Sequence, residues 1–109
     1  MKSKSPFLAV FFALLMGSLS PQVLAGTFAQ HHPRRVQVNR RLRVQNRRIH
    51  QQVRERELNP RQAQRLHHAD RRIRGEERRF ARHHHGVITR AEQARLNRQE
   101  NRVSHRIGR

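Results

Sequence analysis

The chain has 109 residues, 25 of them Lys or Arg against 7 Asp or Glu, with a formal net charge of +18 and no cysteine. The lack of cysteine excludes a disulfide framework and thiolate chemistry, and the charge favours anionic partners. The hydroxyl side chains after residue 25 are Thr27, Thr89 and Ser104, so nucleophilic catalysis has little support. We therefore predict a protein that is not an enzyme and needs no cofactor.

Residues 1–25 are predicted to be a secretory signal peptide. Two lysines precede an apolar run from Phe7 to Met16, and small residues then lead to Ala25, after which cleavage is expected. The apolar run is too short to span a membrane. The mature chain retains 23 Arg and 7 acidic residues, a charge of +16. Signals of this style are typical of bacterial proteins that are exported to the periplasm or secreted.

The spacing of apolar residues predicts an all-α fold with three amphipathic helices, at about 34–57, 60–84 and 89–106. Each helix contains a Leu that is followed seven positions later by Ile or Val, which places both side chains on one face. The pairs are Leu42–Ile49, Leu66–Ile73 and Leu96–Val103. After a flexible leader at 26–33, residues 34–109 are predicted to form one domain. It is either an open bundle or a helical hairpin with a third arm.

Two helix-start signals lie thirty positions apart. Asn59 and Thr89 each have a side-chain oxygen that can accept a hydrogen bond from the first turn of a helix. Gln62 and Glu92, three residues further on, can bond back to the backbone N–H of the capping residue. The two capping boxes therefore predict where the second and third helices begin.

The predicted helix ends depend on Pro and Gly. The first helix is expected to end before Asn59, because the residue that precedes Pro60 avoids the α-helical region. Gly75 lies inside the second helix, where it costs about 1 kcal/mol relative to Ala and marks a soft spot. Gly86 is predicted to occupy the left-handed C′ position after that helix, with Val87 as its apolar contact.

The predicted apolar seam is narrow because polar residues interrupt it. Between the apolar pairs stand Gln45 or Asn46, Ala69 or Asp70, and Gln99 or Glu100. Burial of a large aliphatic side chain contributes about 1.5–3 kcal/mol, whereas ordering each residue costs about 1–2 kcal/mol. We therefore expect the isolated chain to be only marginally stable, and we expect a partner or a homo-oligomer to add to its stability.

Arginines cover most of the polar surface of the first two predicted helices. Guanidinium groups bind phosphate and carboxylate bidentately, so these residues predict a sequence-independent binder of anions. The expected partners are lipopolysaccharide, anionic lipid, nucleic acid, and acidic or unfolded protein. A solvated cationic coat without a partner is the alternative. The predicted polyanion-binding residues are Arg40, Arg41, Arg43, Arg47, Arg48, Arg71, Arg72, Arg74, Arg78 and Arg79.

Histidine clusters leave metal binding as an open alternative. His67, His68, His83, His84 and His85 are residues of a type that binds Zn, Cu or Ni, but their spacing completes no closed site. Residues 86–92 also follow the second half of an EF-hand loop. The calcium positions before Gly86 would hold Ala81, His83 and His85, which supply no carboxylate, so we predict no calcium site and assign no residue as a metal ligand.

Two family resemblances involve these motifs. Residues 38–107 resemble a group of small uncharacterised exported bacterial helical proteins, through Gly86-x-Ile88-Thr89-x-x-Glu92 and the segment from Gln99 to Ser104. Residues 58–62 are similar to the LTxxQ motif of Spy/CpxP-type periplasmic proteins. The second resemblance implies a basic, helical, cofactor-free chaperone or envelope-stress protein that binds unfolded clients as a dimer with an apolar concave face. Some relatives in that family sense metals.

Overall fold

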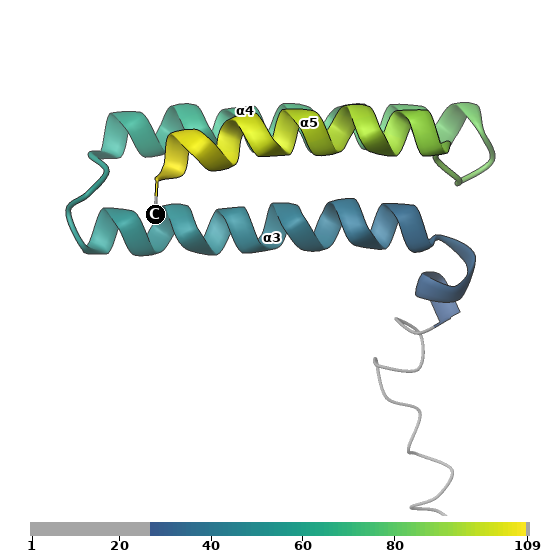
Figure 1. Ribbon diagram of the computed structural model, residues 1–109, viewed down its shortest axis with the longest axis horizontal. Coiled ribbons are helices and arrows are strands. Elements are labelled where there is room, and N and C mark those ends of the chain that lie inside the picture. Colours follow the sequence, from purple (N-terminus) through teal and green to yellow (C-terminus); the bar gives the residue numbers. More distant parts are fainter. Residues whose placement is uncertain (1–26, 109) are drawn as a thin grey trace, which may run out of the picture.

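The computed structural model describes residues 27–108, and these residues form helices and turns without a strand (Figure 1). The long helices are α3 (Pro33–Arg54), α4 (Pro60–His83) and α5 (Arg90–Ile107). The prediction of an all-helical fold is therefore confirmed. The predicted signal peptide lies outside the described residues. Among the described helices, none combines the length and the apolar character that a membrane span requires.

A short helical segment at residues 27–31 precedes α3, so the described residues contain four helical segments rather than the three predicted. Within the predicted leader at 26–33, residues 27–31 are therefore helical. The Phe28 and His32 rings lie 4.6 Å apart between centroids, and the Arg35 guanidinium lies 5.4 Å from the centroid of the Phe28 ring. The backbone N–H of His32 also donates to the Phe28 carbonyl at 2.8 Å. These contacts give the segment partners that its sequence did not reveal.

Each of the three long helices contacts the other two, so α5 packs along both α3 and α4 rather than standing apart as an arm (Figure 1). The three predicted Leu–Ile or Leu–Val pairs are all buried in the core. Val38 and Ile88 are also completely buried, whereas Val53 and Phe80 are only partly buried at the edge of the core.

Both predicted capping boxes are present. The Gln62 backbone N–H donates to Asn59 Oδ1 at 2.8 Å, and the Asn59 N–H donates to Gln62 Oε1 at 2.9 Å. The Glu92 N–H donates to Thr89 Oγ1 at 3.1 Å, and the Thr89 N–H donates to Glu92 Oε1 at 2.8 Å. The helix starts at Pro60 and Arg90 are therefore set by local sequence.

The end of α3 lies three residues before the predicted one. The N–H of Glu57 donates to the carbonyl of Gln52 at 2.8 Å, and the N–H of Arg56 donates to the carbonyl of Val53 at 3.0 Å. These two bonds form a Schellman ending, with Arg56 in the left-handed region at φ 62°. The left-handed residue therefore ends α3 several residues before Asn59, whose backbone is kept out of the α-helical region by Pro60.

The end of α4 also differs from the prediction. His85 occupies the left-handed C′ position at φ 55°, and Gly86 follows at φ 91°. The N–H of Gly86 donates to the Ala81 carbonyl at 2.7 Å. Val87 is exposed, and it is the next residue, Ile88, that enters the core. The chain uses two successive left-handed residues, so the apolar contact falls one residue later than predicted.

Candidate anion-binding surface

The acidic residues of the helices are withdrawn from their outer surfaces. Asp70, Glu77 and Glu100 are buried in the bundle, with Glu100 completely inaccessible to solvent. Glu76 and Glu92 are partly buried. Glu76 forms an ion pair with Arg95 at 2.8 Å, and Glu92 Oε2 lies 3.2 Å from His84 Nε2. The remaining two, Glu55 and Glu57, are exposed in the turn between α3 and α4. Negative charge is therefore concentrated inside the bundle, at the partly buried Glu76 and Glu92, and in the turn between α3 and α4.

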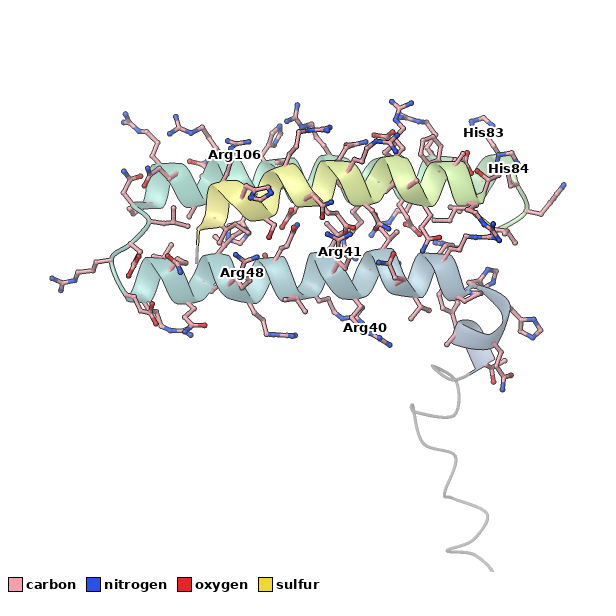
Figure 2. All side chains as sticks on the ribbon, in the orientation of Figure 1. Arg40, Arg41, Arg48, His83, His84 and Arg106 are labelled. Atoms are coloured by element: carbon pink, nitrogen blue, oxygen red, sulfur yellow. The ribbon has the colours of Figure 1, made fainter. Side chains whose placement is uncertain are left out.

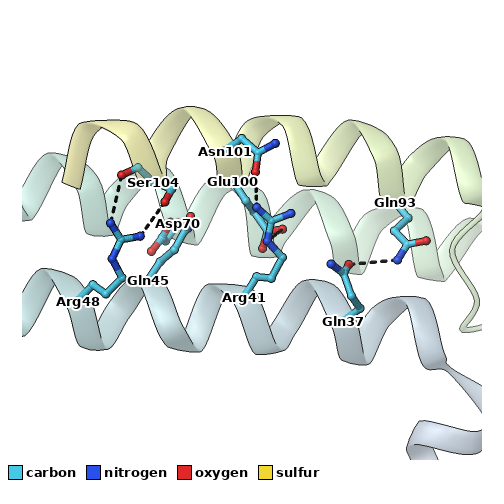
Figure 3. Close-up of polar contacts among 9 residues, drawn as sticks. All are labelled: Gln37, Arg41, Gln45, Arg48, Asp70, Gln93, Glu100, Asn101 and Ser104. Atoms are coloured by element: carbon cyan, nitrogen blue, oxygen red, sulfur yellow. Dashed lines mark hydrogen bonds and ion pairs between the residues drawn. The ribbon is translucent and has the colours of Figure 1, made fainter. Parts of the chain in front are cut away.

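Three interhelical contacts hold the buried carboxyl groups. Arg35 Nε lies 2.5 Å from Glu77 Oε1. Arg41 Nε lies 3.6 Å from Glu100 Oε1, while its Nη2 donates to the side chain of Asn101. The Gln45 amide donates to Asp70 Oδ1 at 2.9 Å (Figure 3). Each contact joins α3 to α4 or α5, so the polar residues that interrupt the apolar seam connect the helices.

Two of these carboxyl groups have raised pKa values. Burial raises the pKa of Glu100 to about 7, against the opposing attraction of Arg41 and with a further increase from Asp70. Burial raises the pKa of Asp70 to about 6, although the hydrogen bond from Gln45 and the charge of Arg74 oppose this. Protons therefore neutralise part of the internal negative charge close to neutral pH.

Around the first half of α4, six exposed arginines surround the junction with the end of α5. We call them the basic face: Arg61, Arg65, Arg71, Arg72, Arg102 and Arg106. The α4 members Arg61, Arg65 and Arg72 are spaced by four and seven residues and so project from one side of the helix. None of the six forms an ion pair or a side-chain hydrogen bond within the described part of the chain. Their guanidinium groups are free for an external anion.

The basic face surrounds three adjoining hollows that meet at Arg106. A hollow of about 350 Å³ is lined by Arg61, Arg65, Arg71, Arg72 and Arg106 together with Gln64 and His68. A second hollow, of about 410 Å³, lies between α4 and α5 and includes Arg72, Arg102 and Arg106. A third, of about 250 Å³, includes Arg65 and Arg106. The single acid that lines any of the three is Glu76, which already pairs with Arg95.

The ten predicted polyanion-binding arginines occupy different environments. Arg71, Arg72, Arg78 and Arg79 are exposed on α4, and Arg40, Arg43 and Arg47 are exposed on α3, whereas Arg74 is partly buried. Figure 2 shows Arg41 and Arg48 directed between the helices and Arg40 directed away from the bundle.

Arg41 and Arg48 are engaged inside the protein. Arg41 binds Glu100 and Asn101. Arg48 Nη1 donates to Ser104 Oγ at 2.7 Å (Figure 3). Arg48 Nη2 donates to the carbonyl of Gly108. These two side chains join α3 to α5, so they are structural residues rather than free cationic groups.

Four residues of the basic face, Arg61, Arg65, Arg102 and Arg106, are not among the predicted polyanion-binding residues. The spacing of Arg61 and Arg65 relative to Arg72 was a usable signal, because it places them on one stripe of a single helix. Arg102 and Arg106 gave no such signal, since they join the α4 arginines only when α5 packs beside α4.

The histidines named as metal-ligand alternatives do not converge. His83, His84 and His85 are exposed at the end of α4, where His84 pairs with Glu92. His67 is partly buried, whereas the adjacent His68 is exposed and lines the 350 Å³ hollow. Within residues 27–108, no three His, Asp or Glu side chains are grouped as metal ligands. Thr89 and Glu92, which belong to the EF-hand-like segment, are used in the capping box of α5.

Comparisons of the chain with protein-family models, with curated proteins and with solved structures find no match. The resemblances to small exported bacterial proteins and to Spy/CpxP-type proteins therefore stay predictions from short motifs.

Proposed function

We propose that this protein is a non-enzymatic binder of anionic polymers or anionic surfaces, and that it binds them through the basic face. The observation that carries this proposal is the set of six exposed, unpaired arginines around adjoining hollows. Glu76 is the single acid that lines these hollows and it is paired with Arg95, so an incoming anion meets almost uncompensated positive charge. The predicted signal peptide at residues 1–25 supports a location of this activity in the bacterial envelope, in the periplasm or outside the cell.

The chemistry of the basic face supports recognition of charge rather than of base sequence. Guanidinium forks bind phosphate oxygens bidentately, and such phosphate contacts carry no information about base sequence. Phe28 and Phe80 are the aromatic residues of the predicted mature chain, and neither lines the basic-face hollows. A stacking platform for single-stranded nucleic acid is therefore missing from this surface. Lipopolysaccharide, anionic lipid, nucleic acid and acidic protein share the anionic groups that such a face can bind.

The chaperone alternative has less support among the described residues. Their exposed large apolar side chains are Phe28, Val44 and Val87, which belong to three different segments. A client-binding face would need a contiguous apolar patch of several hundred Å². Assays of client aggregation in low and high salt distinguish an apolar client site from simple attraction of acidic proteins.

The proposal is tested by measuring affinity for heparin, duplex DNA and anionic vesicles across a salt series. Each phosphate neutralised on duplex DNA contributes about 0.9 to the slope of log affinity against log salt. We expect tight binding at low salt and a steep negative slope for all three ligands. Binding that is absent at low salt, or that ignores salt, would rule out the proposal.

Two variants with the same change in charge locate the surface. The first replaces Arg65, Arg72 and Arg106 with Gln, and the second replaces Arg40, Arg43 and Arg47 with Gln on α3. We expect the first variant to lose at least tenfold in DNA affinity at low salt and about 2–3 in the salt slope. The second variant should lose less on both measures. Equal losses would show that binding is spread over the whole cationic surface instead of the basic face.

A further inference from the structure

His50 of α3 and His67 of α4 lie against each other across the helix interface. Their ring centroids are 4.9 Å apart and the ring planes are inclined by 45°. His50 is exposed and His67 is partly buried. Two imidazoles in contact repel each other when both are protonated, so the pair responds to any ligand that changes the local charge.

The two rings line a cavity of about 530 Å³ between the end of α3 and the beginning of α4. Arg54 from α3 and Arg71 from α4 line the same cavity, together with the amide of Gln64. The apolar lining residues are Val53, Pro60 and Ala63. No acidic side chain and no residue of α5 takes part in this lining, so every charged or titratable group that lines the cavity is basic.

The sign of these charges decides which ligand the cavity favours. A divalent metal ion would find two imidazole ligands, but it would stand between two guanidinium groups in a strongly cationic protein. A phosphate group would instead accept hydrogen bonds from the imidazoles and from the same guanidinium groups, and it would relieve their mutual repulsion. The arrangement therefore favours an oxyanion over a metal cation.

We propose that the cavity between α3 and α4 binds a phosphate group between His50, His67, Arg54 and Arg71, and that proton uptake by His67 strengthens this binding. The inference deepens the proposed function on which it rests, because it names the anionic group and makes acidity its regulator. Arg71 belongs both to this cavity and to the basic face. A phosphate bound in the cavity and an anionic group bound at the basic face would therefore both lie next to Arg71.

The environment of His67 supports proton-linked binding. Burial lowers the pKa of this imidazole, and the neighbouring His50 and Arg71 lower it further. A phosphate anion among the same groups acts in the opposite direction, since it stabilises the imidazolium ion. By linkage, a ligand that raises the histidine pKa must itself bind more tightly to the protonated protein.

The test is a pH titration of the histidine ring resonances by NMR, with and without saturating inorganic phosphate at constant ionic strength. We expect phosphate to raise the pKa of His67 by about one unit, which corresponds to about tenfold tighter binding to the protonated form. His83, His84 and His85 serve as internal controls and should shift much less. Equal shifts at all histidines, or no shift at His67, would overturn the proposal.

Variants separate this inference from the proposed function. In a variant with His50→Gln and His67→Gln, we expect binding of DNA and of phosphatidylglycerol vesicles at pH 8 to stay close to that of the unmodified protein. The increase in phosphate affinity between pH 8 and pH 5.5 should be largely lost in this variant, whereas a variant with His83, His84 and His85 replaced by Gln should retain it.

If the variant with His50→Gln and His67→Gln binds at pH 8 but keeps the full pH effect, the inference is wrong and the proposed function stands. If neither DNA nor vesicles bind at pH 8, the proposed function fails.

Two further comparisons identify the source of the phosphate and the competing ligand. A larger pH effect with phosphatidylglycerol vesicles than with duplex DNA or inorganic phosphate would assign the site to a lipid head group and support the inference. A histidine pair that binds Zn²⁺ at micromolar concentration but shows no response to phosphate would overturn it.

Discussion

Arg41 of α3 faces Glu100 of α5 inside the bundle, with Nε and Oε1 3.6 Å apart, and the Glu100 side chain is completely buried. Neither carboxyl oxygen of Glu100 accepts a hydrogen bond from the described residues. The ion pair therefore compensates only part of the lost hydration of the carboxylate, and this is why burial dominates its pKa.

Replacement of Glu100 by Gln should stabilise the protein at pH 8. The pKa of Glu100 is raised to about 7 in the folded protein, so the folded state holds this proton more tightly than the unfolded chain does. The contribution of this group to stability is therefore greatest at acidic pH and falls as pH rises from about 4.5 through 7. We expect Glu100→Gln to raise the free energy of unfolding by about 1–3 kcal/mol at pH 8 and to have little effect near pH 5.

Denaturant unfolding at both pH values measures this difference, and Asp70→Asn provides a parallel case because burial raises that pKa to about 6. His67 acts in the opposite direction, since its lowered pKa makes acid destabilising near its usual titration range. The comparison of variant with unmodified protein at each pH removes this background. A stability difference that does not depend on pH would contradict the account of Glu100.

Loss of Arg35 should be strongly destabilising. Its Nε lies 2.5 Å from the carboxylate of Glu77, which is only 1% exposed, and its Nη1 donates to the Gly86 carbonyl at 3.2 Å. Arg35→Gln leaves a buried carboxylate without its cationic partner, which costs about 3 kcal/mol or more. Thermal or urea unfolding measures the loss. Replacing both partners, with Arg35→Met and Glu77→Leu, should recover most of it, and Arg40→Gln on the exposed side of α3 should change stability by less than about 0.5 kcal/mol.

Gly75→Ala should stabilise α4. Gly75 is exposed within a continuous helix, and a Cβ atom added there meets no other atom within 4 Å. Alanine loses less backbone entropy on folding, so the free energy of unfolding should increase by about 0.5–1 kcal/mol. A thermal melt measures this as an increase in Tm of several degrees. A lower Tm would show that the helix does not run straight through this position.

Removal of the cap of α5 should destabilise the protein without changing its fold. Thr89 Oγ1 accepts the backbone N–H of Glu92 at 3.1 Å, and alanine supplies no such acceptor. Thr89→Ala should cost about 1 kcal/mol in urea unfolding, and Thr89→Ser should retain most of that stability. An equal loss in both variants would mean that the threonine methyl group, rather than the capping oxygen, is responsible.

The histidine pair shows why sequence reasoning about sites was incomplete. The sequence indicates His67, His68 and the run from His83 to His85 as candidate ligands, because these histidines are neighbours in the chain. His50 stands alone in the sequence, yet its ring contacts His67. Similarly, the sequence groups Arg48 with the surface arginines, whereas in the structure its side chain contacts Ser104 and Gly108.

The sequence alone determined the features that depend on local interactions. The helical class, the two capping boxes and the buried Leu–Ile and Leu–Val pairs follow from hydrogen bonds and periodicities within a few residues. Only the tertiary structure decided which polar groups face inward and which arginines remain free. That outcome depends on the rotation of each helix about its axis and on its neighbours, because a carboxylate or guanidinium is buried only where a partner on another helix meets it. The meeting of Arg106 with the arginines of α4, and of His50 with His67, is decided at this level of the structure.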